Sequence, residues 1–241
     1  MSCVVYTCHD VIPLTAGIEK RGTKNLDDFL QQIRWLKRLG VRFIALHDFQ
    51  SWLNGRKKIP IRAAVLTFDD AYESIQIHLF PFLQKEKIPF TIFVIAGFIG
   101  RQSNFYGQSG GDLRRHLDLR ALKQLIQSGL VEVGSHGYYH FNLSQISGEK
   151  LRQEIHGSKE RLEDSLKINV PYFAYPYGVS TTTVVEKVKA AGYQLAFSTR
   201  KLKLSSRSVD RFRIPRVGWG RRATLFKLYK YYLIPGLRSA G

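Results

Sequence analysis

The stretch AAVLTFDD, residues 63–70, decides the fold class of this chain. Its first six residues form a nearly continuous apolar run, which is typical of a central strand in a parallel sheet that is buried on both faces. Two aspartates, Asp69 and Asp70, follow the run directly. The pattern therefore predicts a buried strand that delivers two carboxylates to its carboxyl end.

Strand and helix patterns alternate on both sides of this stretch, and this alternation indicates an α/β fold. Helical patterns are predicted at 25–40, 79–87, 119–128, 149–166 and 182–191. Short β-branched or aromatic runs predict strands at 4–7, 41–46, 63–68, 90–95, 130–133, 172–175 and 195–198. About seven strands in one chain of this length favour a single domain built as a closed or nearly closed (β/α) barrel. A doubly wound open sheet is the alternative.

The chain is strongly basic. It has 241 residues and a formal net charge of +18, which favours an anionic partner such as a membrane, nucleic acid or phosphorylated carrier. The segment 199–241 holds twelve Lys or Arg and one acid, Asp210. Within it, residues 223–233 have helical apolar spacing and are expected to form either the last barrel helix or a basic helix on an anionic membrane surface. No nucleic-acid-binding motif is present, so nucleic acid is not expected as a partner.

Targeting signals are not expected in this sequence. The longest apolar run, residues 88–100, is shorter than the roughly 18 residues that a spanning helix needs. A secretory signal would require a basic region before its apolar stretch, and no such region precedes His9. Cys3 and Cys8 are too far apart on one strand to form a disulfide. These features predict a cytoplasmic protein, with contact at the cytoplasmic face of the membrane as an added possibility.

Several polar side chains follow predicted strands, and both architectures bring the carboxyl ends of the strands to one edge. They are His9, Asp69 with Asp70, His136 with His140, and the turn YPYG at 175–178. The spacing of four between the two later histidines would place both imidazoles on one face of a helical turn, as a shared metal requires. With Asp70 they make three ligands and leave a position for water.

Two imidazole nitrogens and one carboxylate oxygen suit zinc, cobalt, nickel or manganese better than calcium or magnesium. Such a metal lowers the pKa of a bound water from about 16 to about 7 and so generates a nucleophile at neutral pH. Each motif alone has an ordinary explanation, because paired aspartates also cap helices and HxxxH also occurs by chance. Their joint occurrence predicts a hydrolase with one divalent metal, most simply zinc.

Three segments together resemble the polysaccharide deacetylase family, also called the NodB homology or carbohydrate esterase family 4 proteins. They are TFDD at 67–70, EVGSH at 132–136 followed by His140, and FAYPYG at 173–178. The resemblance spans roughly residues 2–220. It implies a distorted (β/α) barrel and the metal-dependent removal of N-acetyl groups from sugars.

The resemblance also implies roles for individual residues. Asp69 corresponds to the catalytic base of the family. The family's late histidine motif is missing after residue 200, but YTCH at 6–9 resembles an element of the circularly permuted branch, which includes poly-N-acetylglucosamine deacetylases. On this reading His9 is the catalytic acid. The metal ligands would be Asp70, His136 and His140.

Two positions depart from the family pattern. Gly137 stands where a Ser or Thr is frequent, and Ala174 stands where many members carry an arginine that orients the base. Arg213 or Arg216 of the segment RIPR can supply that charge instead, as a similar segment does in the permuted branch. We name Arg216 as the candidate.

Three aromatic residues are expected to bind substrate by stacking on sugar faces: Tyr175, Tyr177 and Trp219. The backbone N–H of Tyr177 is expected to stabilise the oxyanion that develops during amide hydrolysis, together with the metal. The expected substrate is an N-acetylated sugar in a polysaccharide, an oligosaccharide or a lipid-linked glycan. Two alternatives stay open: a catalytically inactive carbohydrate-binding homologue, and a deformylase or amidase that acts on a lipid-linked amino sugar.

Overall fold

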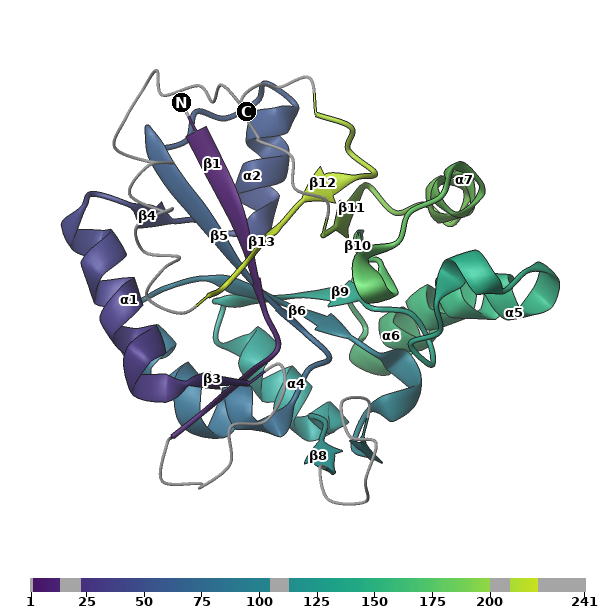
Figure 1. The fold of residues 1–241 in the computed structure, drawn as a ribbon, viewed down its shortest axis with the longest axis horizontal. Coiled ribbons are helices and arrows are strands. Elements are labelled where there is room, and N and C mark those ends of the chain that lie inside the picture. The colour runs from purple at the N-terminus through teal and green to yellow at the C-terminus, as the bar shows by residue number, and fades with distance from the viewer. Residues whose placement is uncertain (1, 14–22, 105–112, 200–208, 221–241) are drawn as a thin grey trace.

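The computed structural model describes residues 2–13, 23–104, 113–199 and 209–220 (Figure 1). Within these residues the main sheet has nine strands in the order β12-β11-β10-β9-β6-β5-β1-β13, and β4 also pairs with β5. All of its strand pairs are parallel. The strands are β1 (Ser2–Cys8), β4 (Arg42–Phe43), β5 (Arg62–Asp69), β6 (Phe90–Val94), β9 (Val131–Ser135), β10 (Tyr172–Ala174), β11 (Leu195–Ser198), β12 (Ile214–Pro215) and β13 (Val217–Gly218).

The sheet is nearly closed into a barrel by one short segment. Strand β12 pairs with β11 at one end of the strand order, and β13 pairs with β1 at the other end. A single residue, Arg216, separates these two strands in the sequence. Residues 214–218 therefore connect the two edges of the sheet, and the predicted barrel is confirmed. The strand count exceeds the predicted seven because β12 and β13 are too short to show as apolar runs.

Helices surround the barrel, and α2 lies near the amino ends of β1 and β5 (Figure 1). The side chains of Asn25, Asp118 and Thr181 cap the helices α1, α4 and α7. Two π-helical turns, η2 (Ile75–Leu79) and η5 (Gln153–Gly157), interrupt the helical stretches around them. The helices are α1 (Leu26–Arg38), α2 (Leu46–Leu53), α3 (Phe80–Lys85), α4 (Leu119–Gln127), α5 (Gly148–Arg152), α6 (Ser158–Leu166) and α7 (Thr182–Ala190).

Two small sheets lie beside the main one: a parallel pair, β2 (Asp10–Ile12) with β3 (Thr23–Asn25), and an antiparallel pair, β7 (Gln102–Ser103) with β8 (Arg114–Arg115). The strand expected at 41–46 is shorter than predicted, because only β4 pairs with β5 and helix α2 begins at Leu46. Among the described residues, no helix is both long and apolar enough to cross a membrane. The expected helix at 223–233 lies outside the described residues, so the membrane contact and the cytoplasmic location stay predictions.

Strand β5 divides the core into two parts. Its side chains alternate, so that Val65 belongs to one hydrophobic cluster while Leu66 and Phe68 belong to another. The rings of Phe93 and Phe197 lie 5.5 Å apart although β6 and β11 are separated by two strands in the sheet. This contact therefore crosses the barrel interior. The hydrophobic cluster that contains Val65 lies there, and it also includes apolar side chains of α2.

Two aromatic residues that were expected to bind sugar lie in the core instead. Trp219 is only 4% exposed, and its ring packs against Tyr6 at 5.0 Å and Phe29 at 4.5 Å. Its backbone N–H donates to the carbonyl of Thr7. Tyr175 is fully buried, and its hydroxyl donates to the carbonyl of Phe212. Both predictions of sugar stacking were wrong, because these rings fill the space between the barrel and its outer layer.

This placement predicts that Trp219→Ala lowers the free energy of unfolding by about 3–5 kcal/mol, as expected when a large core aromatic side chain is truncated. Tyr177→Ala is the control, because its side chain is 61% exposed and surface changes cost about 0.5 kcal/mol or less. Urea denaturation followed by circular dichroism measures both. Equal stability of the two variants would contradict the core assignment of Trp219.

Candidate active site

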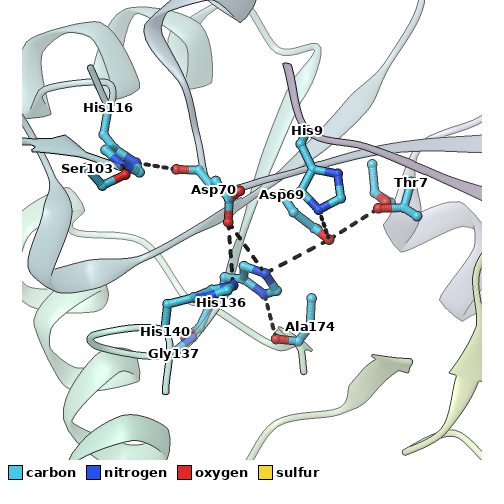
Figure 2. A network of polar contacts seen from close by, with 12 residues as sticks. Thr7, His9, Asp69, Asp70, Ser103, His116, His136, Gly137, His140 and Ala174 are labelled. Carbon is cyan, nitrogen blue, oxygen red and sulfur yellow. Dashed lines mark hydrogen bonds and ion pairs between the residues drawn. The ribbon is translucent and has the colours of Figure 1, made fainter. Parts of the chain in front are cut away.

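The polar residues at the ends of three strands meet at the carboxyl end of the barrel (Figure 2). His9 follows β1, Asp69 ends β5 and Asp70 comes directly after it, and His136 follows β9. The loop after β9 also carries His140. Figure 2 shows their side chains pointing toward one another, as the strand-end pattern predicts for parallel strands.

Three of these side chains form a group that fits a metal ion. The Oδ1 atom of Asp70 lies 3.7 Å from Nε2 of His136 and 3.7 Å from Nε2 of His140. All three donor atoms lie within 4.8 Å of one another, and the three residues are buried. Ligand atoms around a tetrahedral zinc ion are about 3.4 Å apart when each bond is about 2.1 Å long. The spacing and the donor types therefore fit a divalent metal held by three protein ligands.

Both histidines have a form that can bind a metal. The Nδ1 atom of His136 lies 2.8 Å from the carbonyl of Ala174, so this nitrogen carries the proton and Nε2 keeps its lone pair. Burial is the largest cause that lowers the pKa of His140, to about 4. Since only neutral imidazole binds a metal, His140 is in its binding form at neutral pH.

The two histidines do not share a helical turn, contrary to the expectation from their spacing. Residues 136–140 form a loop in which Gly137 has a φ of +82° and His140 a φ of +66°. The carbonyls of Gly137 and Tyr138 accept hydrogen bonds from the N–H groups of Ala96 and Gly97. The loop therefore lies against the turn that follows β6, and the left-handed conformations direct both imidazoles to the same point.

Asp70 also has an uncommon backbone conformation. Its φ is +69° and that of Ala71 is +58°, so two consecutive residues with side chains adopt the left-handed region. The ring Nδ1 of His116 lies 2.6 Å from the Asp70 carbonyl, and the other ring nitrogen lies 2.7 Å from the hydroxyl of Ser103 (Figure 2). The Leu117 N–H donates to the Ala71 carbonyl. Sequence reasoning missed His116, because nothing in its own segment links it to residue 70.

Asp69 is held by a buried arginine. Its Oδ1 and Oδ2 atoms accept hydrogen bonds from Nη1 and Nη2 of Arg216 at 2.6 and 2.7 Å, and Thr7 donates to Oδ2 at 3.2 Å. Of the two arginines considered, Arg216 is the one that contacts Asp69. The Arg213 guanidinium pairs with Asp210 instead.

The protonation state of Asp69 follows from these contacts. Burial by itself raises the pKa of Asp69, but the charge of Arg216 and the hydrogen bonds that it donates hold this pKa well below its usual range. The carboxyl group is therefore ionised at neutral pH. Its Oδ2 atom lies 4.0 Å from Nε2 of His136, one of the candidate metal-ligating atoms, so it is placed to accept a proton beside the group that fits a metal.

His9 and Tyr177 border the same group of residues from the solvent side. The Nε2 atom of His9 lies 4.0 Å from Oδ2 of Asp69, and the His9 side chain is 32% exposed. The Tyr177 ring is exposed and lies 4.8 Å from the ring of His140. Next to it, residues 177–181 and Thr199 line a hollow of about 320 Å³. Of the three aromatic residues expected to contact sugar, Tyr177 is the one at the site.

Comparison with known proteins relates this geometry to a family. The family model for polysaccharide deacetylase matches residues 56–196, which include Asp69, Asp70 and the two histidines. The poly-beta-1,6-N-acetyl-D-glucosamine N-deacetylase of Staphylococcus aureus is 30% identical over 200 residues, which cover 78% of this chain and 65% of the relative. The enzyme of the same name from Staphylococcus epidermidis is 28% identical, with 87% of this chain and 73% of the relative covered.

Solved structures agree with this result. The structure of IcaB from Ammonifex degensii superposes with a TM-score of 0.82 at 29% identity and covers 97% of both chains. The Streptococcus pyogenes deacetylase PplD has a TM-score of 0.80 at 22% identity, covers 97% of this chain and 99% of its own, and shows the same fold. The family model matches more than half of the chain and includes the Asp69–Asp70 and His136–His140 motifs. The chain therefore belongs to the polysaccharide deacetylase family.

Proposed function

We propose that this protein is a metal-dependent hydrolase that removes N-acetyl groups from an N-acetylated amino-sugar polymer. The observation that carries the proposal is the Asp69 carboxylate, which Arg216 holds between the group that fits a metal and the partly exposed His9. The printed names of the staphylococcal relatives support poly-β-1,6-N-acetylglucosamine as the substrate. The chain spans 65% of the length of the S. aureus relative, so substrate and activity are proposed for it.

Each residue near the site has a distinct role in this proposal. Asp70, His136 and His140 would hold the divalent metal, which supplies a Lewis acid and lowers the pKa of a coordinated water. Asp69 accepts the proton of the attacking water, and Arg216 keeps the carboxylate ionised and correctly oriented. His9, in its imidazolium form, donates a proton to the sugar nitrogen as the C–N bond breaks. Acetate and a free sugar amine are the products.

The proposal also assigns the oxyanion and the sugar to the turn that follows β10. The turn η6 (Pro176–Gly178) follows β10, and Tyr177 adopts a φ of +58° within it. In the proposal, the Tyr177 N–H donates to the developing oxyanion and its exposed ring contacts the sugar. The hollow lined by residues 177–181 and Thr199 lies beside this turn and is open to receive the substrate.

The reaction itself is the first test. We expect the zinc-reconstituted protein to release acetate from poly-N-acetylglucosamine oligomers, and enzymatic acetate detection measures it. Matched N-formylated oligomers tested for formate release separate the deacetylase from a deformylase. Release of formate alone would contradict the proposed acyl group, and release of neither acid would favour the inactive carbohydrate-binding homologue.

Asp69→Asn tests the base, because the amide keeps the shape of the side chain and cannot accept the proton of water. We expect kcat to fall by about 10²-fold to 10⁴-fold, the usual contribution of a positioned general base. Asp48→Asn is the control, since Asp48 lies on α2 near the amino ends of the strands and pairs with Lys57. Full activity in Asp69→Asn would contradict the assignment.

His136→Ala tests the metal centre. Elemental analysis of the zinc-reconstituted wild type should give about one metal per chain, as expected for a site with three protein ligands, and the variant should lose this metal. His47→Ala serves as the control, because its side chain is 63% exposed and contacts Glu132 and Asp48 instead. Retention of one zinc per chain in His136→Ala would show that the ion binds elsewhere.

A further inference from the structure

Glu154 is a buried carboxylate outside the group of residues described above. It lies on the π-helical turn η5 and is only 1% exposed. Its Oε2 atom accepts a hydrogen bond from the Tyr138 N–H at 3.0 Å, and its Oε1 atom accepts one from the Tyr139 N–H at 2.7 Å. Both oxygens therefore bind the backbone of the loop that connects His136 to His140.

This loop needs such an acceptor. With left-handed φ values at Gly137 and His140, the loop does not provide the regular backbone partners of a helix or a strand. An N–H that loses its hydrogen-bond acceptor is destabilised unless it finds another one, so we expect the loop to rearrange if the carboxylate is removed. We expect such a rearrangement to move His140 relative to His136, because His136 is anchored separately through Ala174.

Gly137 shows how closely the carboxylate and the loop fit. A Cβ atom at this position would lie 2.7 Å from Oε2 of Glu154. Real Cβ atoms do not approach this closely, so a side chain at residue 137 would displace the carboxylate or the loop. The glycine thus allows Glu154 to reach the N–H groups of residues 138 and 139.

Glu132 provides a comparison within the same molecule. Its carboxylate also accepts backbone N–H hydrogen bonds, in this case from Leu46 and His47 at the start of α2. It lies near the amino end of β9, whereas His136 follows the carboxyl end of that strand. Glu132 therefore supports a helix terminus, while Glu154 supports the segment between two candidate metal ligands.

We propose that Glu154 is a positioning residue for the metal centre, which sets the affinity for the metal by holding the 137–139 backbone and thereby the place of His140. The inference rests on the metal site of the proposed function. Its test reads metal binding directly and does not depend on catalysis or on the identity of the sugar.

The experiment compares the zinc affinity of the wild type, Glu154→Gln and Glu132→Gln by competition with a chromogenic zinc chelator. Glutamine keeps the size of the side chain but presents an NH₂ donor to an N–H of the loop. We expect Glu154→Gln to bind zinc about 10-fold to 100-fold more weakly, the usual effect of losing a residue that orients a metal ligand. Glu132→Gln should stay within about twofold of the wild type, since His136 and His140 keep their supports.

A second pair of variants leaves the charge of Glu154 in place. Gly137→Ala forces the carboxylate and the loop apart, and Gly192→Ala is its control, because Gly192 has a similar φ of +78° with nothing within 4 Å of its would-be Cβ. Both variants add a Cβ atom to a residue with a similar left-handed φ, but only Gly137→Ala should weaken zinc binding. If Glu154→Gln does not fold, this pair still tests whether the contact between Glu154 and the loop sets the zinc affinity.

The outcomes separate this inference from the proposed function. All affinities are measured well below the unfolding transition of each variant, so a loss of stability alone does not change them. Unchanged zinc affinity in folded Glu154→Gln and Gly137→Ala would overturn the positioning role and leave the proposed function intact. A wild type that binds no zinc would overturn both.

Discussion

The bidentate ion pair between Asp69 and Arg216 links the closure of the barrel to the assembly of the site. Arg216 is the single residue between β12 and β13, the strands that join the two edges of the sheet. Its guanidinium also donates to the hydroxyl of Thr67 and lies 5.3 Å from the centre of the Phe93 ring. A buried charge of this kind is tolerated only when its partner and hydrogen bonds are in place. The closing segment and the central strand β5 therefore depend on each other.

This dependence has a chemical consequence. A buried ion pair often adds little to net stability, because removing two charges from water is costly. Here the arrangement orients a carboxylate and keeps it ionised beside a group that fits a metal. Arg216 and His9 both lie outside the segment matched by the family model, residues 56–196. The two residues that complete the proposed chemistry thus come from near the two ends of the described residues.

Two of the three candidate metal ligands have a strained backbone conformation. Asp70 and His140 both have positive φ values, which cost free energy for residues with side chains and persist only where the surroundings impose them. The ring of His116 supports the first of these residues through its carbonyl, and the carboxylate of Glu154 supports the loop that carries the second. Neither support can be found from spacing, because each lies in another segment and acts on backbone atoms.

Local sequence patterns were enough to predict the strand-helix alternation, the buried strand β5, and the carboxylates and histidines at strand ends. Apolar runs and the polar residues next to them involve neighbours in the chain, so a short segment of sequence is enough to predict the strand or helix that they form. Long-range packing decided the rest. It placed Arg216 rather than Arg213 on Asp69, and it left Tyr177 at the surface while Tyr175 and Trp219 entered the core. Aromatic side chains suit both a core and a sugar-binding surface, and only the three-dimensional packing determines which one they occupy.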